Sequence, residues 1–193
     1  MVQVRRNHSE GAFTAVAVAA VVCVLAACAS AWAAEPPHEY RVKAAFIYHF
    51  LHFTDWPGGV FAADDAPIVV GVVGGDAFQG ALDQALRDKT VRGRPIVLRH
   101  FDAPGDVRDC HLLFVSPASG QTVGNVLRRV RGAPVLTVSD GGGDFTRSGG
   151  VLRLLVEEDK VRFEVNLTAA ERQQLRMSAK LLKLARLYEE PSS

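Results

Sequence analysis

One stretch of the sequence, Ile68 to Val73, restricts the fold more than any other. It is a continuous apolar run bounded by Pro67 on one side and by Gly74 and Gly75 on the other. A short apolar run between turn residues is typical of a strand that is buried on both faces. Such a strand belongs to a sheet that is covered on both sides. The run therefore predicts a layered α/β fold.

Strands and helices alternate after this run. Apolar runs predict further strands at 96–101, 111–116 and 135–138, and helical spacing predicts helices at 78–87 and 123–130. Two last strands, Val151–Val156 and Lys160–Val165, flank an acidic turn and predict an antiparallel hairpin. We therefore expect a single α/β domain, a sandwich with a mixed, partly antiparallel sheet flanked by helices.

A helix is predicted from Glu39 to Phe53, where Val42, Phe46, Phe50 and Phe53 recur at helical spacing. Lys43 lies on the same apolar face. An unpaired buried ammonium is costly, so we expect this side chain to extend toward solvent or to pair with a carboxylate.

A closing helix is predicted after Asn166, because Thr168 to Glu171 has the pattern of a capping box. Apolar residues as far as Tyr188 recur at helical spacing on one side of this helix. The other side carries a basic stripe of Arg172, Arg176, Lys180, Lys183 and Arg186.

The first residues indicate an export signal. Arg5 and Arg6 precede an apolar run from Ala15 to Ala27, and small residues follow, which is typical of a signal peptide. Two processing sites fit. A cut after Ala33 gives a signal peptide of residues 1–33, whereas a lipobox ending at Cys28 gives a leader of 1–27 and a lipid anchor on Cys28. Residues 34–38 then form a linker and 39–190 the domain, which we expect in the periplasm.

The cysteines predict a fold without disulfides. Cys23 leaves with either leader, and Cys28 leaves with the longer one or is acylated, so Cys110 is the one cysteine of the domain. Cys110 precedes an apolar run, which favours a buried and unreactive thiol.

The charges exclude one class of partner. The net charge is +1, from 22 basic and 21 acidic residues, and removal of Arg5, Arg6 and Glu10 with a leader leaves 20 of each. A neutral domain has no global field that would draw it onto nucleic acid. We therefore expect no nucleic-acid partner.

Motifs for catalysis and for cofactors are missing from the sequence. The glycines between Gly71 and Gly80 match neither phosphate-binding pattern, and there is no Gly-x-Ser-x-Gly elbow. His49 and His52 lack a third zinc ligand at a suitable spacing, and Asp140 and Asp144 lack the ligand series of a calcium site. We therefore expect no enzyme activity, no cofactor and no metal.

Two surfaces remain as candidates for binding a partner. The first is an aromatic cluster at the end of the first helix, formed by Phe50, Phe53 and Trp56, since aromatic residues are enriched at interfaces. The second is the basic stripe of the closing helix with its enclosed apolar residue, namely Arg172, Arg176, Lys180, Lys183 and Leu187.

The order and spacing of several short segments resemble the YfiR family of exported regulators. The segments are Glu39–Tyr48, Phe53–Pro57, Cys110–Val115, Leu136–Asp140, Phe145 with Gly149–Gly150, Val161–Leu167 and Leu181–Ala185. The resemblance covers almost the whole mature chain.

The resemblance implies a periplasmic α/β protein that binds the periplasmic sensor part of an inner-membrane diguanylate cyclase and restrains it. An outer-membrane lipoprotein would relieve the restraint by sequestering the regulator, so that cyclic di-GMP and biofilm formation rise. The alternative that we keep is a periplasmic module that binds a small molecule and is coupled to a membrane signalling protein.

The sequence departs from the family at one position. Relatives often carry a cysteine in the first strand that could face Cys110, whereas Ile68 to Val73 has none. A redox switch is therefore not expected in this chain. A homodimer cross-linked through Cys110 stays open as an alternative.

Overall fold

The computed structural model describes residues 37–74, 77–101, 106–116, 120–142 and 144–189. The chain divides into two units, Met1–Glu35 and Pro36–Ser193. The first unit lies outside the described residues, and so do the expected signal peptide, both processing sites and Cys28. The fold below is that of the second unit.

The helices and strands follow one another along the chain in a largely alternating order. The helices are α2 (His38–Phe53), α3 (Ala77–Leu86), α4 (Gly120–Val130), α5 (Asp144–Arg147), α6 (Leu167–Arg172) and α7 (Ala179–Leu182), with a 3-10 turn η1 (Val107–Asp109). The strands are β1 (Thr54–Asp55), β2 (Ile68–Val73), β3 (Thr90–Val91), β4 (Arg94–Phe101), β5 (Leu112–Val115), β6 (Leu136–Ser139), β7 (Leu152–Glu157), β8 (Lys160–Val165), β9 (Arg176–Met177) and β10 (Arg186–Leu187).

Eight of these strands form one mixed sheet in the order β10-β8-β7-β6-β5-β2-β4-β3. The central strands β4, β2, β5, β6 and β7 run parallel to one another. Both margins contain an antiparallel pair, β7 with β8 and β3 with β4. The expected α/β fold with a mixed, partly antiparallel sheet is thus confirmed.

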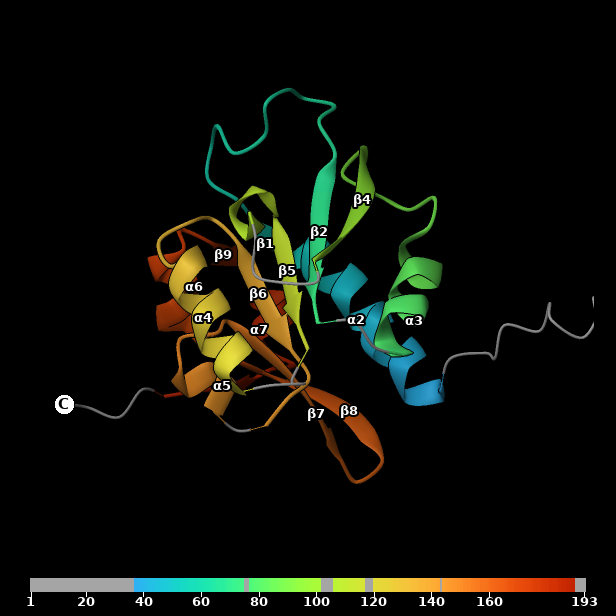
Figure 1. The fold of residues 1–193 in the computed structure, drawn as a ribbon, viewed down its shortest axis with the longest axis vertical. Coiled ribbons are helices and arrows are strands. Elements are labelled where there is room, and N and C mark those ends of the chain that lie inside the picture. Colours follow the sequence, from blue (N-terminus) through green and yellow to red (C-terminus); the bar gives the residue numbers. More distant parts are fainter. Residues whose placement is uncertain (1–36, 75–76, 102–105, 117–119, 143, 190–193) are drawn as a thin grey trace, which may run out of the picture. The chain divides into compact units, whose positions relative to one another are not determined.

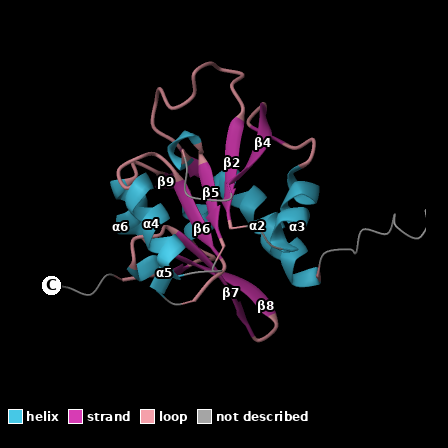
Figure 2. Ribbon diagram, viewed as in Figure 1, coloured by secondary structure: helices cyan, strands magenta, loops and turns pink. Residues whose placement is uncertain are grey.

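Helices cover both faces of this sheet (Figure 1, Figure 2). All six residues of β2 are buried, and they alternate between two hydrophobic clusters. Ile68, Val70 and Val72 pack with residues of α2, α3, α6 and α7, whereas Val69 and Val73 pack with residues of η1, α4 and α5. The apolar run from Ile68 to Val73 is therefore a strand covered on both sides, as predicted.

The buried face of α2 differs from the predicted one. Phe50 is fully buried as expected, but the rest of the buried face consists of Ala44, Ile47 and Leu51. Phe46 and Phe53 lie at the edge of the core and are partly buried. Phe46 and Phe50 both contact the ring of Phe163 on β8, with centroids 5.7 Å and 5.2 Å apart.

Lys43 on this face is buried and paired, as expected. Its Nζ lies 2.6 Å from Glu39 Oε1 and 2.9 Å from Asp140 Oδ2. Burial alone would lower the pKa of Lys43, but the hydrogen bonds and charges of the two carboxylates outweigh burial and raise it. The pair ties α2 to the loop after β6.

The single closing helix predicted from the sequence is wrong. Helix α6 ends at Arg172, and Gln174 adopts a left-handed conformation with φ of 58°. The amide of Leu175 donates to the Ala170 carbonyl and the amide of Gln174 to the Glu171 carbonyl, which is the hydrogen-bond pattern of a Schellman motif. The motif stops the helix without glycine or proline, so the sequence carried no stop signal.

The start of α6 also differs from the predicted capping box. Asn166 is the N-cap, and its side chain accepts a hydrogen bond from the Ala169 amide at 2.8 Å. Asn166 Nδ2 donates to the carbonyl of Thr146 at 2.9 Å, which attaches the start of α6 to α5. Asn is as good an N-cap as Thr, and here it offers a second bond that Thr168 does not.

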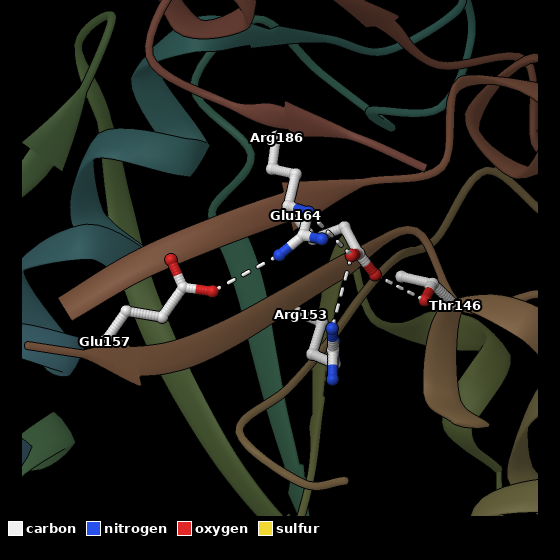
Figure 3. Close-up of polar contacts among 5 residues, drawn as sticks. All are labelled: Thr146, Arg153, Glu157, Glu164 and Arg186. Carbon is white, nitrogen blue, oxygen red and sulfur yellow. Dashed lines mark hydrogen bonds and ion pairs between the residues drawn. The ribbon is translucent and has the colours of Figure 1, made fainter. Parts of the chain in front are cut away.

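The margin formed by β7, β8 and β10 is joined by one buried carboxylate, Glu164 (Figure 3). Thr146 Oγ1 donates to Glu164 Oε1 at 2.7 Å, and Arg153 Nη2 lies 3.2 Å from Oε2. Arg186 reaches the same carboxylate at 4.0 Å and pairs with Glu157 at 3.2 Å. Because the partners come from α5, β7 and β10, the side chain of Glu164 connects the outer strands with a helix.

Cys110 is buried, as expected, and it forms no disulfide with another described residue. Burial raises the pKa of the Cys110 thiol to about 11, so the thiol stays protonated at neutral pH and is a poor nucleophile. The neighbouring position on β2 is Gly71, where an added Cβ would lie 2.5 Å from Cys110 Sγ and 2.7 Å from a methyl group of Leu113. Gly71 thus leaves room for the thiol.

We predict that Gly71→Ala lowers the free energy of unfolding by about 1–3 kcal/mol, because the new methyl group overpacks the core. Gly71→Cys should form a disulfide with Cys110 on oxidation and should regain about 2–4 kcal/mol relative to its reduced form. Urea unfolding with and without reductant measures both effects, in a chain whose Cys23 and Cys28 are replaced by serine. Free thiols in the oxidised Gly71→Cys protein would contradict the placement of Cys110.

We predict that Gln174→Gly stabilises the fold by about 0.5–1 kcal/mol, since the left-handed conformation is strained for every residue with a Cβ. Gln174→Ala retains the strain and serves as the control. Thermal and urea unfolding measure the difference. A Gln174→Gly protein no more stable than Gln174→Ala would mean that α6 does not end in this motif.

Candidate functional site

Two segments that the sequence analysis placed on separate surfaces lie side by side. Strands β1 and β9 form a two-stranded antiparallel sheet with Thr54 opposite Met177 and Asp55 opposite Arg176. The amide of Ser178 extends the pairing by donating to the Phe53 carbonyl at 2.9 Å. The residue after β1 is Trp56, which this pairing brings close to Arg176.

A cleft of about 660 Å³ opens between these segments. We call it the Trp56 cleft, and its lining residues are Asp55, Trp56, Pro57, Gly58, Glu171, Gln174, Leu175 and Arg176. Trp and Arg are the residue types most enriched in the energetic centres of protein interfaces. The cleft combines an aromatic ring with charges of both signs, which suits a partner surface of mixed charge.

A second hollow, of about 320 Å³, shares Asp55 and Trp56 with the cleft. We call it the Thr54 hollow, and its lining residues are Leu51, Thr54, Asp55, Trp56, Phe61, Asp64, Ile68, Val91, Arg92 and Arg94. Thr54 is fully buried, and its Oγ1 makes no hydrogen bond with the described residues. A buried hydroxyl without a partner is costly, so a molecule that offered it a hydrogen bond would be favoured.

His111 holds the side chain of Trp56 in place. The indole Nε1 donates to the His111 carbonyl at 3.1 Å. The ring of Phe61 stacks on the His111 ring with centroids 4.4 Å apart and an angle of 7°. The Arg94 guanidinium lies over the Phe61 ring, 4.0 Å from its centroid. These contacts fix the segment after Trp56 against the amino ends of β2 and β5.

The protonation of His111 is set by its surroundings. Its Nδ1 accepts a hydrogen bond from the Val69 amide at 3.0 Å, so the neutral ring carries its proton on Nε2. Burial, with a smaller contribution from the charge of Arg94, lowers the pKa of His111 below its ordinary value of 6.5. His111 is therefore neutral at pH 7.

The residues predicted to bind a partner are dispersed by the break in the closing helix. Phe50 is wholly buried in the core and cannot touch a partner, which corrects that prediction. Phe53 is partly buried and packs against the core. Trp56 follows β1. The five residues predicted on the closing helix lie on separate elements: Arg172 on α6, Arg176 on β9, Lys180 on α7, Lys183 at the C-cap of α7 and Leu187 on β10.

The structure brings two of these residues, Trp56 and Arg176, to one cleft, and it does not form the predicted basic stripe. Sequence reasoning missed the other walls, Asp55, Glu171 and Leu175. It also missed His111, which supports Trp56. The Phe53–Pro57 segment was the sequence signal for this cleft. Its pairing with Arg176 and Met177 could not be predicted, because periodicity does not report contacts between distant segments.

Among the described residues, no three or more His, Cys, Asp or Glu side chains gather in a way that could hold a metal ion. None of the helices in this part of the chain has the length and apolar character of a bilayer-spanning segment.

Comparisons with known proteins gave one family and nine chains of solved structures, two of which follow. The comparison with curated proteins gave no match. A crystal structure of a conserved domain protein from Vibrio cholerae is 12% identical, with a TM-score of 0.53 over 78% of this chain. An ABC domain in complex with L-Trp from Streptococcus pneumonia is 8% identical, with a TM-score of 0.43 over 62% of this chain.

The Vibrio structure supports the fold alone, because the identity is low, and this chain spans 60% of its length. The Streptococcus structure, of which 55% is covered, is too dissimilar to support an argument. The family match is to the YfiR/HmsC-like family and extends over residues 40–186. Since this range is well over half of the 193 residues, the chain belongs to the YfiR/HmsC-like family.

Proposed function

We propose that the chain is an exported regulator that binds the periplasmic sensor region of a membrane diguanylate cyclase and restrains it, which lowers cyclic di-GMP. Membership of the YfiR/HmsC-like family supports a periplasmic regulatory role in cyclase signalling, without catalysis by the regulator itself. The leader predicted from the sequence would deliver the domain to the periplasm. The domain would be free after removal of residues 1–33, or anchored through a lipid on Cys28.

The Trp56 cleft is the proposed docking site. The observation that carries this assignment is the convergence of Trp56 and Arg176, from the two candidate surfaces, on one cleft through the β1–β9 pairing. Trp56 is fixed by its hydrogen bond to His111, so little side-chain entropy is lost when a partner binds it. A rigid aromatic ring beside an arginine is the composition expected of an interface centre.

Restraint would act by a shift of populations. A regulator inhibits when it binds the inactive conformation of its target more tightly than the active one. A complete swing from 99:1 to 1:99 needs a preference of about 10⁴-fold. An outer-membrane lipoprotein that occupied the same cleft would release the cyclase by competition.

A homodimer cross-linked through Cys110 is not part of the proposal. Cys110 is 3% exposed, and its thiol has a raised pKa. A thiol in this position meets another copy only after local unfolding.

A second candidate function, the small-molecule sensor, is favoured by the Thr54 hollow. Its lining includes the aromatic rings of Trp56 and Phe61 and several aliphatic side chains, and the Thr54 hydroxyl lacks a hydrogen-bond partner among the described residues. These are features of ligand sites. A ligand bound there would contact Trp56 and could set the affinity of the cleft. Thermal-shift screening of wild type and Thr54→Val distinguishes this function, because a true ligand raises the Tm of wild type by mass action.

For the docking site we predict that Arg176→Glu weakens capture of the cyclase sensor region by about tenfold or more, since it reverses a charge in the cleft. Lys180→Glu, which reverses a charge on α7 outside the cleft lining, should have a smaller effect. Biolayer interferometry with the immobilised sensor region measures both affinities.

Arg129→Glu is the matched control, because Arg129 is exposed on α4 and does not line the cleft. Its affinity should equal that of wild type. Equal weakening by all three variants would reveal a long-range charge effect, and an unchanged affinity of folded Arg176→Glu would remove the cleft from the interface.

A further inference from the structure

We propose that His111 makes the Trp56 cleft sensitive to acid, so that protonation of its ring releases the segment carrying Trp56 and weakens capture of the partner. The inference rests on the proposed function for its last step. Its first step, the release of the segment, is a property of this chain alone.

His111 connects three parts of the site through four hydrogen bonds. Its amide donates to the Val69 carbonyl at 2.8 Å, and its Nδ1 accepts from the Val69 amide at 3.0 Å. Its carbonyl accepts from the Leu136 amide at 2.9 Å and from Trp56 Nε1 at 3.1 Å. The residue therefore joins β2, β6 and Trp56 at one point.

The His111 ring also supports the segment after Trp56. Phe61 stacks on it almost in parallel, and Arg94 lies against the ring of Phe61. Arg94 Nη1 in turn donates to the carbonyls of Ala63 at 2.7 Å and Ala66 at 2.9 Å. Phe61 and Arg94 line the Thr54 hollow, which shares Asp55 and Trp56 with the Trp56 cleft, so the stack supports the segment on which both depend.

A proton on Nδ1 is incompatible with this arrangement. Nδ1 accepts the Val69 amide hydrogen, and a protonated Nδ1 would place two donors against each other. The ring would have to turn away from Val69, and turning breaks the parallel stack with Phe61. The imidazolium could interact with the face of Phe61 instead, but the Arg94 cation already lies within reach of that ring.

The charges around the ring add to this effect. The positive charge of Arg94 on β4 disfavours a proton on His111. The neighbouring residue Cys110 contributes no charge, because its thiol stays protonated. Val69 and Leu136 contribute backbone groups alone, and Trp56 and Phe61 are neutral. The charged residues of the adjoining Thr54 hollow are two of each sign, Asp55, Asp64, Arg92 and Arg94.

The direction of the pH effect follows from the lowered pKa. Because the folded protein holds the pKa of His111 below 6.5, the neutral ring contributes stability that is present above pH 6.5. This stability is lost as the pH falls through the lowered pKa of His111. Protonation of His111 therefore changes the cleft when the solution is acidified and has no effect above neutral pH.

The first experiment tests release in the full chain without a partner. ¹⁵N NMR between pH 7.5 and about pH 5 follows the Trp56 indole, the Val69 amide and the His111 ring, with a Trp32→Phe variant to assign the two indoles. We expect all three signals to shift together. A His111 ring that titrates while the other two signals stay fixed would overturn the proposal.

The second experiment tests capture of the cyclase sensor region at both pH values. Wild type should lose about tenfold in affinity on acidification, a typical coupling between two sites. His111→Asn should bind equally at both pH values, because the Asn side-chain oxygen can accept the Val69 hydrogen bond and does not titrate.

Two further histidines serve as controls. His100→Asn changes an exposed residue of β4, and His52→Asn changes a residue of α2 whose pKa is also lowered. Both variants should keep the acid sensitivity of wild type. Equal acid sensitivity in His111→Asn would overturn the inference, whereas absence of capture at any pH would overturn the proposed function and leave the NMR result to decide about His111.

Discussion

The burial of β2 on both faces is the constraint on which the rest of the structure depends. Its side chains alternate between two hydrophobic clusters, so one helix layer alone would leave half of the strand in water. Covering both faces occupies α2 and α3 on one side and α4 on the other. The surface left for binding is then at the ends of the strands, and the Trp56 cleft lies at the amino ends of β2 and β5. In parallel sheets small ligands commonly bind at the opposite, carboxyl ends, where Lys43 and Asp140 are paired with each other.

The residues after Asn166 contribute strands to both sheets of the structure. They form two short helices and two short strands, and the strands join different sheets: β9 pairs with β1, and β10 pairs with β8. The Glu164 carboxylate holds the β10 end through Arg186, and the Leu175 amide closes α6 through Ala170. The segment therefore builds one wall of the cleft and also completes a margin of the main sheet.

Much of the framework could be predicted from the sequence, because periodicity reports burial and burial determines the layers. β2 and the β7–β8 hairpin were predicted in this way, and the pairing of Lys43 is one of the two arrangements that were expected. The end of α6 could not be predicted, because Gln174 adopts the left-handed conformation. The usual sequence signal for that conformation is glycine, which is absent at this position. The two-residue strands β1 and β9 are too short for any periodicity. Trp56 and Arg176 were each predicted, but their meeting depends on backbone pairing between distant residues, which no local pattern encodes.

The pairing of β1 with β9 has a consequence for the order of events during synthesis. Strand β1 follows the first helix of the domain, whereas β9 lies close to its last helix. Contacts between residues so far apart along the chain form late, because a long loop must close before they can form. A nascent or clipped chain that ends before Arg176 lacks this wall of the cleft even if its central sheet has folded. Under the docking role proposed for the Trp56 cleft, such an unfinished chain would lack part of the surface that binds the partner.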